Sequence, residues 1–134
     1  MDTEVKTFKH SNGVYNINYH VVWCTKYRKE CLLGGIADDT KDLIKEACEQ
    51  VNCEIKALEI MPDHVHVFLS SIPKRSPHLI VKRLKGVTSN FLRKKYPQLL
   101  ITPSLWTSSY YIGTVGQTSE SVVKLYVENQ KRGR

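Results

Sequence analysis

Several features that mark common protein classes are missing from this sequence of 134 residues. No apolar run approaches the ~18 to 20 residues that a helix needs to cross a bilayer, so we expect no membrane partner. The first residues lack the basic-then-apolar order of a signal peptide. The four cysteines form no C-x-x-C pair, which argues against a zinc ribbon or a redox motif. We therefore expect a cytoplasmic chain with reduced cysteines.

Acidic residues are also missing from one long stretch, because no Asp or Glu occurs between His64 and Ser119. The same stretch contains many basic residues: Lys74, Arg75, Lys82, Arg83, Lys85, Arg93, Lys94 and Lys95. With a formal net charge of +7, this pattern favours a polyanionic partner whose phosphates Lys and Arg neutralise. A solvated basic helix face is the alternative that charge alone leaves open.

The composition is that of an ordinary globular protein, with 41% hydrophobic and 25% charged residues. No internal repeat and no low-complexity linker divides the chain. A chain of this length suits one folding unit. The sequence thus predicts a single domain over residues 1–134, with a core over about 12–116 and a final helix over about 118–130.

Hydrophobic periodicity predicts the elements of the first half. Residues 14–25 alternate as a strand, with its apolar residues on one face and His20 on the other. Gly34 and Gly35 break the chain, and Asp38 or Asp39 is the expected N-cap of a helix. Residues 53–61 form a second strand, which a turn at 61–63 connects as a hairpin to the strand that begins at His64.

The second half contains a helix, a strand and a last helix. Ser76 followed by a proline is a typical helix start, and Pro97 marks the end of this helix. Its core-facing residues are predicted to be Ile80, Leu84, Val87 and Phe91. Residues 105–115 are predicted as a fourth strand, after which Gly113 and Gly116 loosen the chain.

The predicted order is strand, helix, strand, strand, helix, strand. This order indicates an α+β fold, a ferredoxin-like split βαβ (β-α-β-β-α-β) with an antiparallel sheet and both helices on one face. The C-terminal helix with Tyr126 is added to it. The open sheet face would carry His20, His64 and His66, and such a face beside basic residues can serve as a platform for nucleic acid.

The sequence Pro-Asp-His-Val-His at 62–66 is the central motif of the chain. Alternation along a strand places His64 and His66 on one face and Val65 on the other. Two imidazoles at this spacing can hold one metal ion between them. The alternative is a pair of polar side chains on a solvated strand face. His20 is predicted to be a neighbour of this site and not a ligand.

The last helix places Tyr126 and Gln130 one turn apart on the same side. A phenol and an amide oxygen can therefore be presented together, while Val123 and Val127 give the helix an apolar edge. The alternative is that Tyr126 is a packing residue, as most tyrosines on amphipathic helices are. Tyr110 and Tyr111 are rival tyrosines, but within a strand they are expected to pack or stack.

The sequence resembles the single-tyrosine HUH transposases (TnpA-like) of the smallest bacterial insertion sequences. The resemblance covers nearly the whole chain and is carried by four segments: residues 15–28, 61–66, 106–116 and 126–130. It implies that Tyr126 is the nucleophile, and that His64, His66 and Gln130 bind a divalent ion. It also implies a homodimer in which the Tyr126 helix of one subunit can complete the histidine site of the other.

The implied reaction is attack of the Tyr126 oxygen on a phosphodiester of single-stranded DNA, which leaves a 5′-phosphotyrosine and a free 3′-hydroxyl. A phenol with a pKa of ~10 is protonated at neutral pH and needs activation. A metal ion, Mg²⁺ or Mn²⁺, would polarise the scissile phosphate. Two imidazoles and an amide suit Zn²⁺ or Mn²⁺ better than Mg²⁺, but phosphate oxygens would complete a harder ligand set.

Family members recognise hairpins near the ends of the element. Candidate DNA-binding residues here lie in two basic segments: Lys26, Tyr27, Arg28, Lys82, Arg83 and Lys85. Tyr27 is a candidate stacking platform for a base. Three alternatives stay open: a related repeat-associated HUH nuclease, a non-catalytic ferredoxin-like RNA-binding module, and a metal-dependent phosphodiesterase that uses water.

Overall fold

A computed structural model describes residues 8–10, 13–114 and 120–130 of the chain. Its centre is a four-stranded antiparallel sheet with the strand order β4-β5-β3-β6. These strands are β3 (Ile17–Cys24), β4 (Glu54–Met61), β5 (His64–Ser71) and β6 (Tyr111–Thr114). The order of elements and the antiparallel pairing confirm the predicted ferredoxin-like split βαβ fold.

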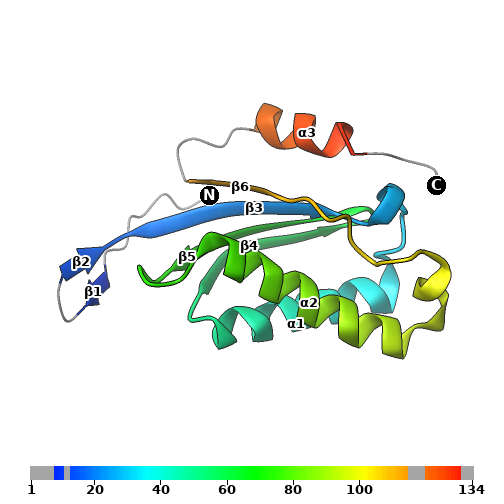
Figure 1. The fold of residues 1–134 in the computed structure, drawn as a ribbon, viewed down its shortest axis with the longest axis horizontal. Helices are drawn as coiled ribbons and strands as arrows, with labels where there is room; N and C mark the ends of the chain where they lie inside the picture. Colours follow the sequence, from blue (N-terminus) through cyan, green and yellow to red (C-terminus); the bar gives the residue numbers. More distant parts are fainter. Residues whose placement is uncertain (1–7, 11–12, 115–119, 131–134) are drawn as a thin grey trace.

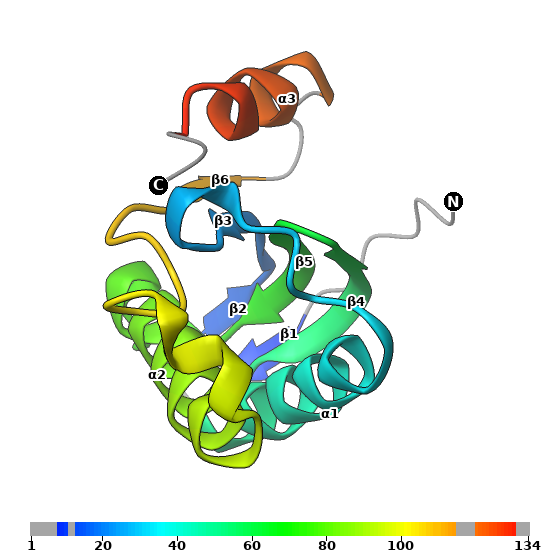
Figure 2. The same cartoon turned by 90° about the vertical axis from the view of Figure 1, so that its right-hand side faces the viewer.

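The three α-helices of the described residues are divided between the two faces of this sheet (Figure 1). The helices α1 (Gly34–Gln50) and α2 (Pro77–Lys95) cover one face, and α3 (Glu120–Glu128) lies on the other. Figure 2 shows that α3 lies above β3 and β6, while no helix of the described residues covers β4 and β5 on this side. No helix in the described part is long and apolar enough to span a membrane.

Alternation along the central strands separates the core from the opposite face. Val21 and Trp23 of β3 pack with Val65 and Val67 of β5 against α1 and α2, and all four are fully buried. Trp23 contacts Trp106 edge-on, with ring centroids 5.8 Å apart. Burial of apolar side chains such as these is the dominant favourable contribution to folding.

The predicted strand over 14–25 is interrupted at Asn16. Residues before it form β2 (Gly13–Tyr15), which pairs with β1 (Phe8–His10) in a separate two-stranded sheet. Residues after it form β3, whose pairing with β5 begins at Ile17 opposite Ser71. β2 and β3 are therefore separate strands, because β2 pairs with β1 and β3 pairs with β5.

The N-cap prediction for the first helix is wrong. Helix α1 begins at Gly34, after Leu33 as N-cap, and Gly34 takes a positive φ of 54° that favours glycine. Asp38 and Asp39 therefore lie inside the helix. The carboxylate of Asp39 accepts hydrogen bonds from Lys95 and Tyr96 at the end of α2, at 2.8 and 2.6 Å.

The start of α2 is as predicted, because the Ser76 hydroxyl accepts a hydrogen bond from the Leu79 amide at 3.1 Å. Its end is also as predicted, and Pro97 begins a short 3₁₀ helix, η2 (Pro97–Ile101). The core prediction fails at Phe91, which is 46% exposed. Thr88 is buried instead, because its hydroxyl donates to the Leu84 carbonyl at 2.8 Å and needs no water.

The predicted fourth strand is shorter than expected. Only Tyr111–Thr114 forms β6, and the earlier part contributes one isolated bridge between Thr25 and Trp106. Gly113 lies within β6, opposite His20, and does not loosen the chain. Residues 115–119, with Gly116 and the predicted helix start at 118, lie outside the described residues. The last helix ends at Glu128, before the predicted end at 130.

Candidate functional site

The histidine pair lies at the start of β5, on the sheet face opposite α1 and α2. His64 pairs in register with Cys24 of β3, and His66 pairs with Val22. Both imidazoles are partly exposed, with 20% and 26% of their side-chain surface accessible. The predicted orientation is confirmed, since the intervening Val65 is fully buried on the other face.

One ring nitrogen of His64 is held by a carboxylate. Its Nδ1 lies 2.9 Å from Asp63 Oδ1, and Asp63 Oδ2 accepts a hydrogen bond from Arg28 Nε at 3.0 Å. Burial opposes ionisation of Asp63, but its bond to His64 and the charges of His64 and Arg28 outweigh burial and lower its pKa. An ionised carboxylate only accepts hydrogen bonds, so this contact favours the His64 tautomer that carries its proton on Nδ1 and its lone pair on Nε2.

His66 has a different set of neighbours. Its Nε2 lies 3.1 Å from His20 Nδ1, and the His20 ring stacks on Phe68 with centroids 4.7 Å apart. Burial lowers the pKa of His66 although Glu59 opposes this, and burial together with His66 lowers the pKa of His20. Both rings are therefore neutral near pH 7, as metal coordination requires. His20 is a direct neighbour of the pair.

Helix α3 packs on the residues that lie directly across from the histidines. Val127 is buried in a small apolar cluster with Val22 and Cys24, the register partners of His66 and His64. Val123 and Tyr126 pack against the same cluster, which confirms the predicted apolar edge. The turn of α3 with Tyr126 is thus one strand away from the histidine pair and on the same sheet face.

Tyr126 and Gln130 meet at Ser109, in the segment that precedes β6. Ser109 Oγ lies 3.0 Å from the Tyr126 phenol oxygen and donates to Gln130 Oε1 at 3.1 Å. Burial raises the pKa of Tyr126, an effect that the hydrogen bond with Ser109 only partly offsets. The phenol is therefore protonated at neutral pH.

The Ser109 segment is fixed to α2 by Lys85. The Lys85 ammonium donates to the carbonyls of Thr107 and Ser109 at 2.6 and 3.1 Å, and burial lowers its pKa.

Sequence reasoning missed Ser109, because a serine in a polar loop carries no local signal of such a role. The adjacency of Asp63 to His64 was a signal that could have been used.

By chemistry, the donors predicted to bind a metal would coordinate a divalent ion only in part. His64 offers a free Nε2, while His66 Nε2 and Gln130 Oε1 are engaged by His20 and Ser109 and would have to exchange these contacts. Within the described ranges no group of three or more His, Cys, Asp or Glu residues could hold a metal. Two imidazoles and one amide leave positions for water and phosphate oxygens, as Mg²⁺ and Mn²⁺ require.

The predicted DNA-binding residues divide into two groups. Residues 26–28 form a 3₁₀ turn, η1 (Lys26–Arg28), directly after β3 and at the same sheet end as His64. Lys82, Arg83 and Lys85 belong to α2, on the helix-covered side of the sheet, where Arg83 donates to Gln50 Oε1 at 2.9 Å. The structure therefore brings the η1 group to the histidine end of the sheet. Lys85 of the α2 group reaches the segment 107–109 that contacts Tyr126.

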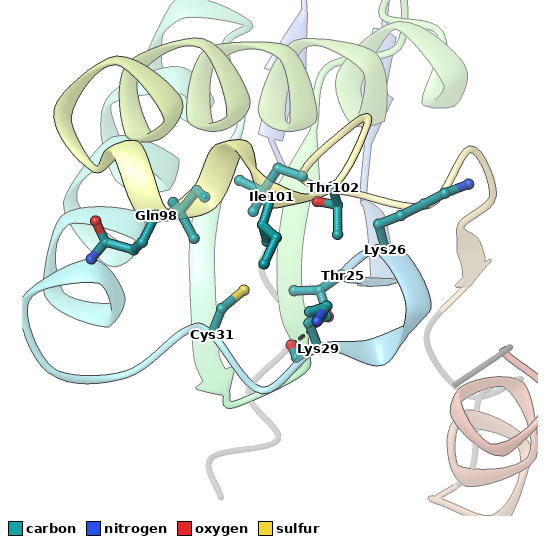
Figure 3. A pocket seen from close by; sticks show the side chains of 9 residues that line it. Thr25, Lys26, Lys29, Cys31, Gln98, Ile101 and Thr102 are labelled. Carbon is teal, nitrogen blue, oxygen red and sulfur yellow. Dashed lines mark hydrogen bonds between the residues drawn. The ribbon is translucent and has the colours of Figure 1, made fainter. Parts of the chain in front are cut away.

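A small cavity lies beside η1, between this turn and η2 (Figure 3). Thr25, Lys26 and Lys29 line it on one side, and Cys31 and Ile101 on another. Its volume of about 30 Å³ has room for a few water molecules at ~10 to 15 Å³ each. It is too small to be a substrate site.

Comparisons with known proteins agree with this arrangement. The family described as "Transposase IS200 like" matches residues 13–130. The ISDra2 transposase TnpA of Deinococcus radiodurans is 39% identical over 120 residues, which cover 87% of this chain and 86% of that protein. The transposase for insertion sequence element IS200 of Salmonella typhimurium is 29% identical over 125 residues, covering 89% and 82%.

Two solved structures are similar in fold. A crystal structure of a candidate transposase from Deinococcus radiodurans superimposes with a TM-score of 0.89 at 35% identity, covering 94% of this chain and 99% of that one. A REP-associated tyrosine transposase bound to a REP hairpin gives a TM-score of 0.57 at 11% identity, covering 96% and 68%. At that identity the second likeness concerns the fold alone.

The fold and the relatives together define a DNA-processing protein of the transposase class. Within that class, the chain belongs to the family of IS200-like transposases.

Proposed function

We propose that this transposase cleaves and rejoins single-stranded DNA at insertion-sequence ends through a 5′-phosphotyrosine at Tyr126. The observation that carries the proposal is the position of α3. Its Tyr126 turn packs on Val22 and Cys24, which are the register partners of the histidine pair. The candidate nucleophile on α3 therefore packs over β3, next to β5 with the two candidate metal ligands, on the same sheet face.

In the proposed reaction, the Tyr126 phenol oxygen forms a bond to phosphorus and the bond from phosphorus to the 3′-oxygen breaks. The phenol loses its proton and the leaving 3′-oxygen gains one. No water is consumed, so a 3′-hydroxyl can reverse the step and rejoin strands without ATP. His64, His66 and Gln130 would hold Mg²⁺ or Mn²⁺, which when bound polarises the phosphate.

The contacts of α3 indicate which hydrogen bonds must break before the proposed reaction can start. Tyr126 and Gln130 both contact Ser109, so both must leave this hydroxyl before they can act on phosphate and metal. We propose that the active form is a homodimer, in which α3 completes the histidine site of its own subunit or of the partner. One proposed nucleophile per chain supports this, because coordinated cleavage of two ends needs two nucleophiles.

The proposed substrate is single-stranded DNA with hairpins at the ends of the element. The basic turn η1 supports this, because Lys26 and Tyr27 lie at the same sheet end as His64 and can bind phosphate and stack on a base. A non-catalytic RNA-binding sheet is less well supported, because Phe68 is covered by the His20 ring. The fold shared with the REP-associated tyrosine transposase keeps a repeat-associated host element as the alternative.

The test is formation of a covalent protein–DNA adduct that survives denaturation. The protein is incubated with single-stranded DNA from the element ends and Mg²⁺, and Tyr126→Phe is compared with Tyr110→Phe. Tyr110 is the matched control, because its hydroxyl contacts His78 of α2 at 3.1 Å, outside the α3 cluster. We expect loss of the adduct in Tyr126→Phe alone, with DNA binding retained. An adduct in Tyr126→Phe, or hydrolysis without one, would refute the proposal.

A mixed-dimer experiment tests where α3 acts. Chains with His64→Ala are mixed with chains that carry Tyr126→Phe, each inactive by itself. If α3 completes the partner's site, the mixture contains one intact composite site and recovers adduct formation. If each subunit uses its own helix, no activity returns.

A further inference from the structure

We propose that Asp63 is a positioning residue for the metal site: its carboxylate orients the His64 imidazole, and Arg28 in turn holds that carboxylate in place. The inference rests on the proposed metal-dependent function and deepens it. It also assigns Arg28 a role different from the DNA contact that its charge suggests.

The geometry of the three side chains supports this role. Asp63 is 7% exposed and uses one oxygen for each neighbour, with Oδ1 at 2.9 Å from His64 Nδ1 and Oδ2 at 3.0 Å from Arg28 Nε. The His64 ring is thereby fixed as the tautomer with its proton on Nδ1, and Nε2 is left to coordinate a metal. A carboxylate behind a metal-binding imidazole fixes its tautomer and raises its basicity as a ligand.

The backbone around Asp63 shows that this arrangement is built into the fold. The Thr25 amide donates to the Asp63 carbonyl at 3.0 Å. The Thr25 hydroxyl lies 2.7 Å from the Lys29 carbonyl and 3.2 Å from the Asp63 carbonyl, and so ties the turn to Asp63. The following residues, Tyr27 and Arg28, both take positive φ angles, of 59° and 52°. Bulky residues rarely adopt this conformation, and it persists only where surrounding contacts hold it. Here the turn directs Arg28 toward Asp63.

The second histidine provides an internal control. His66 also has an acidic neighbour, Glu59, but its Nδ1 lies 3.6 Å from Glu59 Oε1 and the Glu59 side chain is 69% exposed. This distance exceeds that of a hydrogen bond, and solvent screens the pair. Removing the charge of Glu59 should therefore affect metal binding far less than removing that of Asp63.

The experiment compares Asp63→Asn with Glu59→Gln in the full chain. Mn²⁺ binding is measured by calorimetry, and the tautomers of the histidine rings are measured by ¹⁵N NMR without metal or DNA. For Asp63→Asn we expect Mn²⁺ affinity to fall by ~10- to 100-fold and the Nδ1-protonated form of His64 to lose its dominance. Adduct formation should recover at high Mn²⁺. Glu59→Gln should leave affinity and tautomer nearly unchanged.

Arg28→Gln covers the case in which Asp63→Asn fails to fold, because it keeps the carboxylate and removes only its support. Arg28→Gln should lower the Mn²⁺ affinity and the fraction of Nδ1-protonated His64, each by less than Asp63→Asn does. The inference is overturned if His64 keeps its tautomer in the Asp63 and Arg28 variants, or if Glu59→Gln weakens Mn²⁺ binding as much as they do. The tautomer readout needs no catalysis, whereas a wild-type chain that forms no adduct would refute the proposed function alone.

Discussion

The two faces of the central sheet are made by the same strands but have opposite properties. On the helix-covered face, Val65 and Val67 of β5 are fully buried in the apolar core. On the other face, His64 and His66 of the same strand are partly exposed and make polar contacts. Alternation along a strand thus separates stability from chemistry residue by residue. Substitutions on the first face should unfold the protein, and those on the second should disable it.

The largest expected effect on the core face comes from Trp23→Ala. Trp23 is fully buried and packs edge-on against Trp106, so its removal leaves a large cavity. We expect the free energy of unfolding to fall by about 3 to 5 kcal/mol, measured by urea denaturation. His20→Ala, on the same strand but the other face, should cost less than about 1 kcal/mol. Equal losses in both variants would contradict the contrast between the faces.

The second-largest expected effect is a loss of activity, and it tests the sheet face with the histidines. His66→Ala removes a proposed ligand from a partly exposed position, so the unfolding free energy should change by less than about 1 kcal/mol. Adduct formation should fall by at least ~100-fold, because losing a ligand exceeds the ~10- to 100-fold effect of losing its hydrogen-bond partner. Val67→Ala is the control and should show the reverse pattern, reduced stability with adduct formation retained in the folded fraction.

The sequence predicts those features that depend on local periodicity. The shared face of His64 and His66 follows from alternation, and the pairing of Tyr126 with Gln130 follows from one helical turn. The features that it does not predict depend on contacts between distant segments. Lys85 donates to the Thr107 and Ser109 carbonyls just before the shortened last strand, and this contact has no signal in the local pattern.

The errors within α1 and α2 have a similar physical origin. Asp39 has the character of an N-cap residue, but its carboxylate binds Lys95 and Tyr96, which are far away in sequence. Thr88 is polar by type yet buried, because its hydroxyl is satisfied by the preceding turn of its own helix. In both helices, the hydrogen-bond partner decides the role of the residue, and residue type alone does not reveal that partner.

A smaller effect is expected where α3 packs on the open face, through the cluster around Val127. Val127→Ala removes two carbons from this cluster and should weaken docking of α3 by about 1 to 2 kcal/mol. Cys24 provides the measurement, because α3 covers it and burial raises the pKa of its thiol to about 11. Its alkylation, followed by mass spectrometry, should accelerate about 10-fold in the variant.

The pH dependence of Cys24 alkylation follows from the pKa of the Cys24 thiol. Below a pKa of about 11 the reactive thiolate increases about tenfold with each pH unit, so alkylation should accelerate by this factor from pH 7 to 8 and again to 9. Cys48 is buried in the helix-covered core, away from α3, and is the internal control. If Val127→Ala accelerates Cys48 as much as Cys24, the variant loosens the whole fold and not the helix alone.

The smallest effect is expected from Ser109→Ala. The direction in which the rate of adduct formation changes tells whether Ser109 restrains Tyr126 or assists it. The hydroxyl contacts both Tyr126 and Gln130, and in the proposed mechanism both must leave it before reaction. Losing these hydrogen bonds should weaken docking by about 1 kcal/mol, which corresponds to about a fivefold increase in both Cys24 alkylation and the rate of adduct formation. Ser108→Ala, one residue away, should change neither rate. A slower adduct with faster alkylation would show that Ser109 assists the nucleophile in the reaction itself, and that the docked helix is already close to its active arrangement.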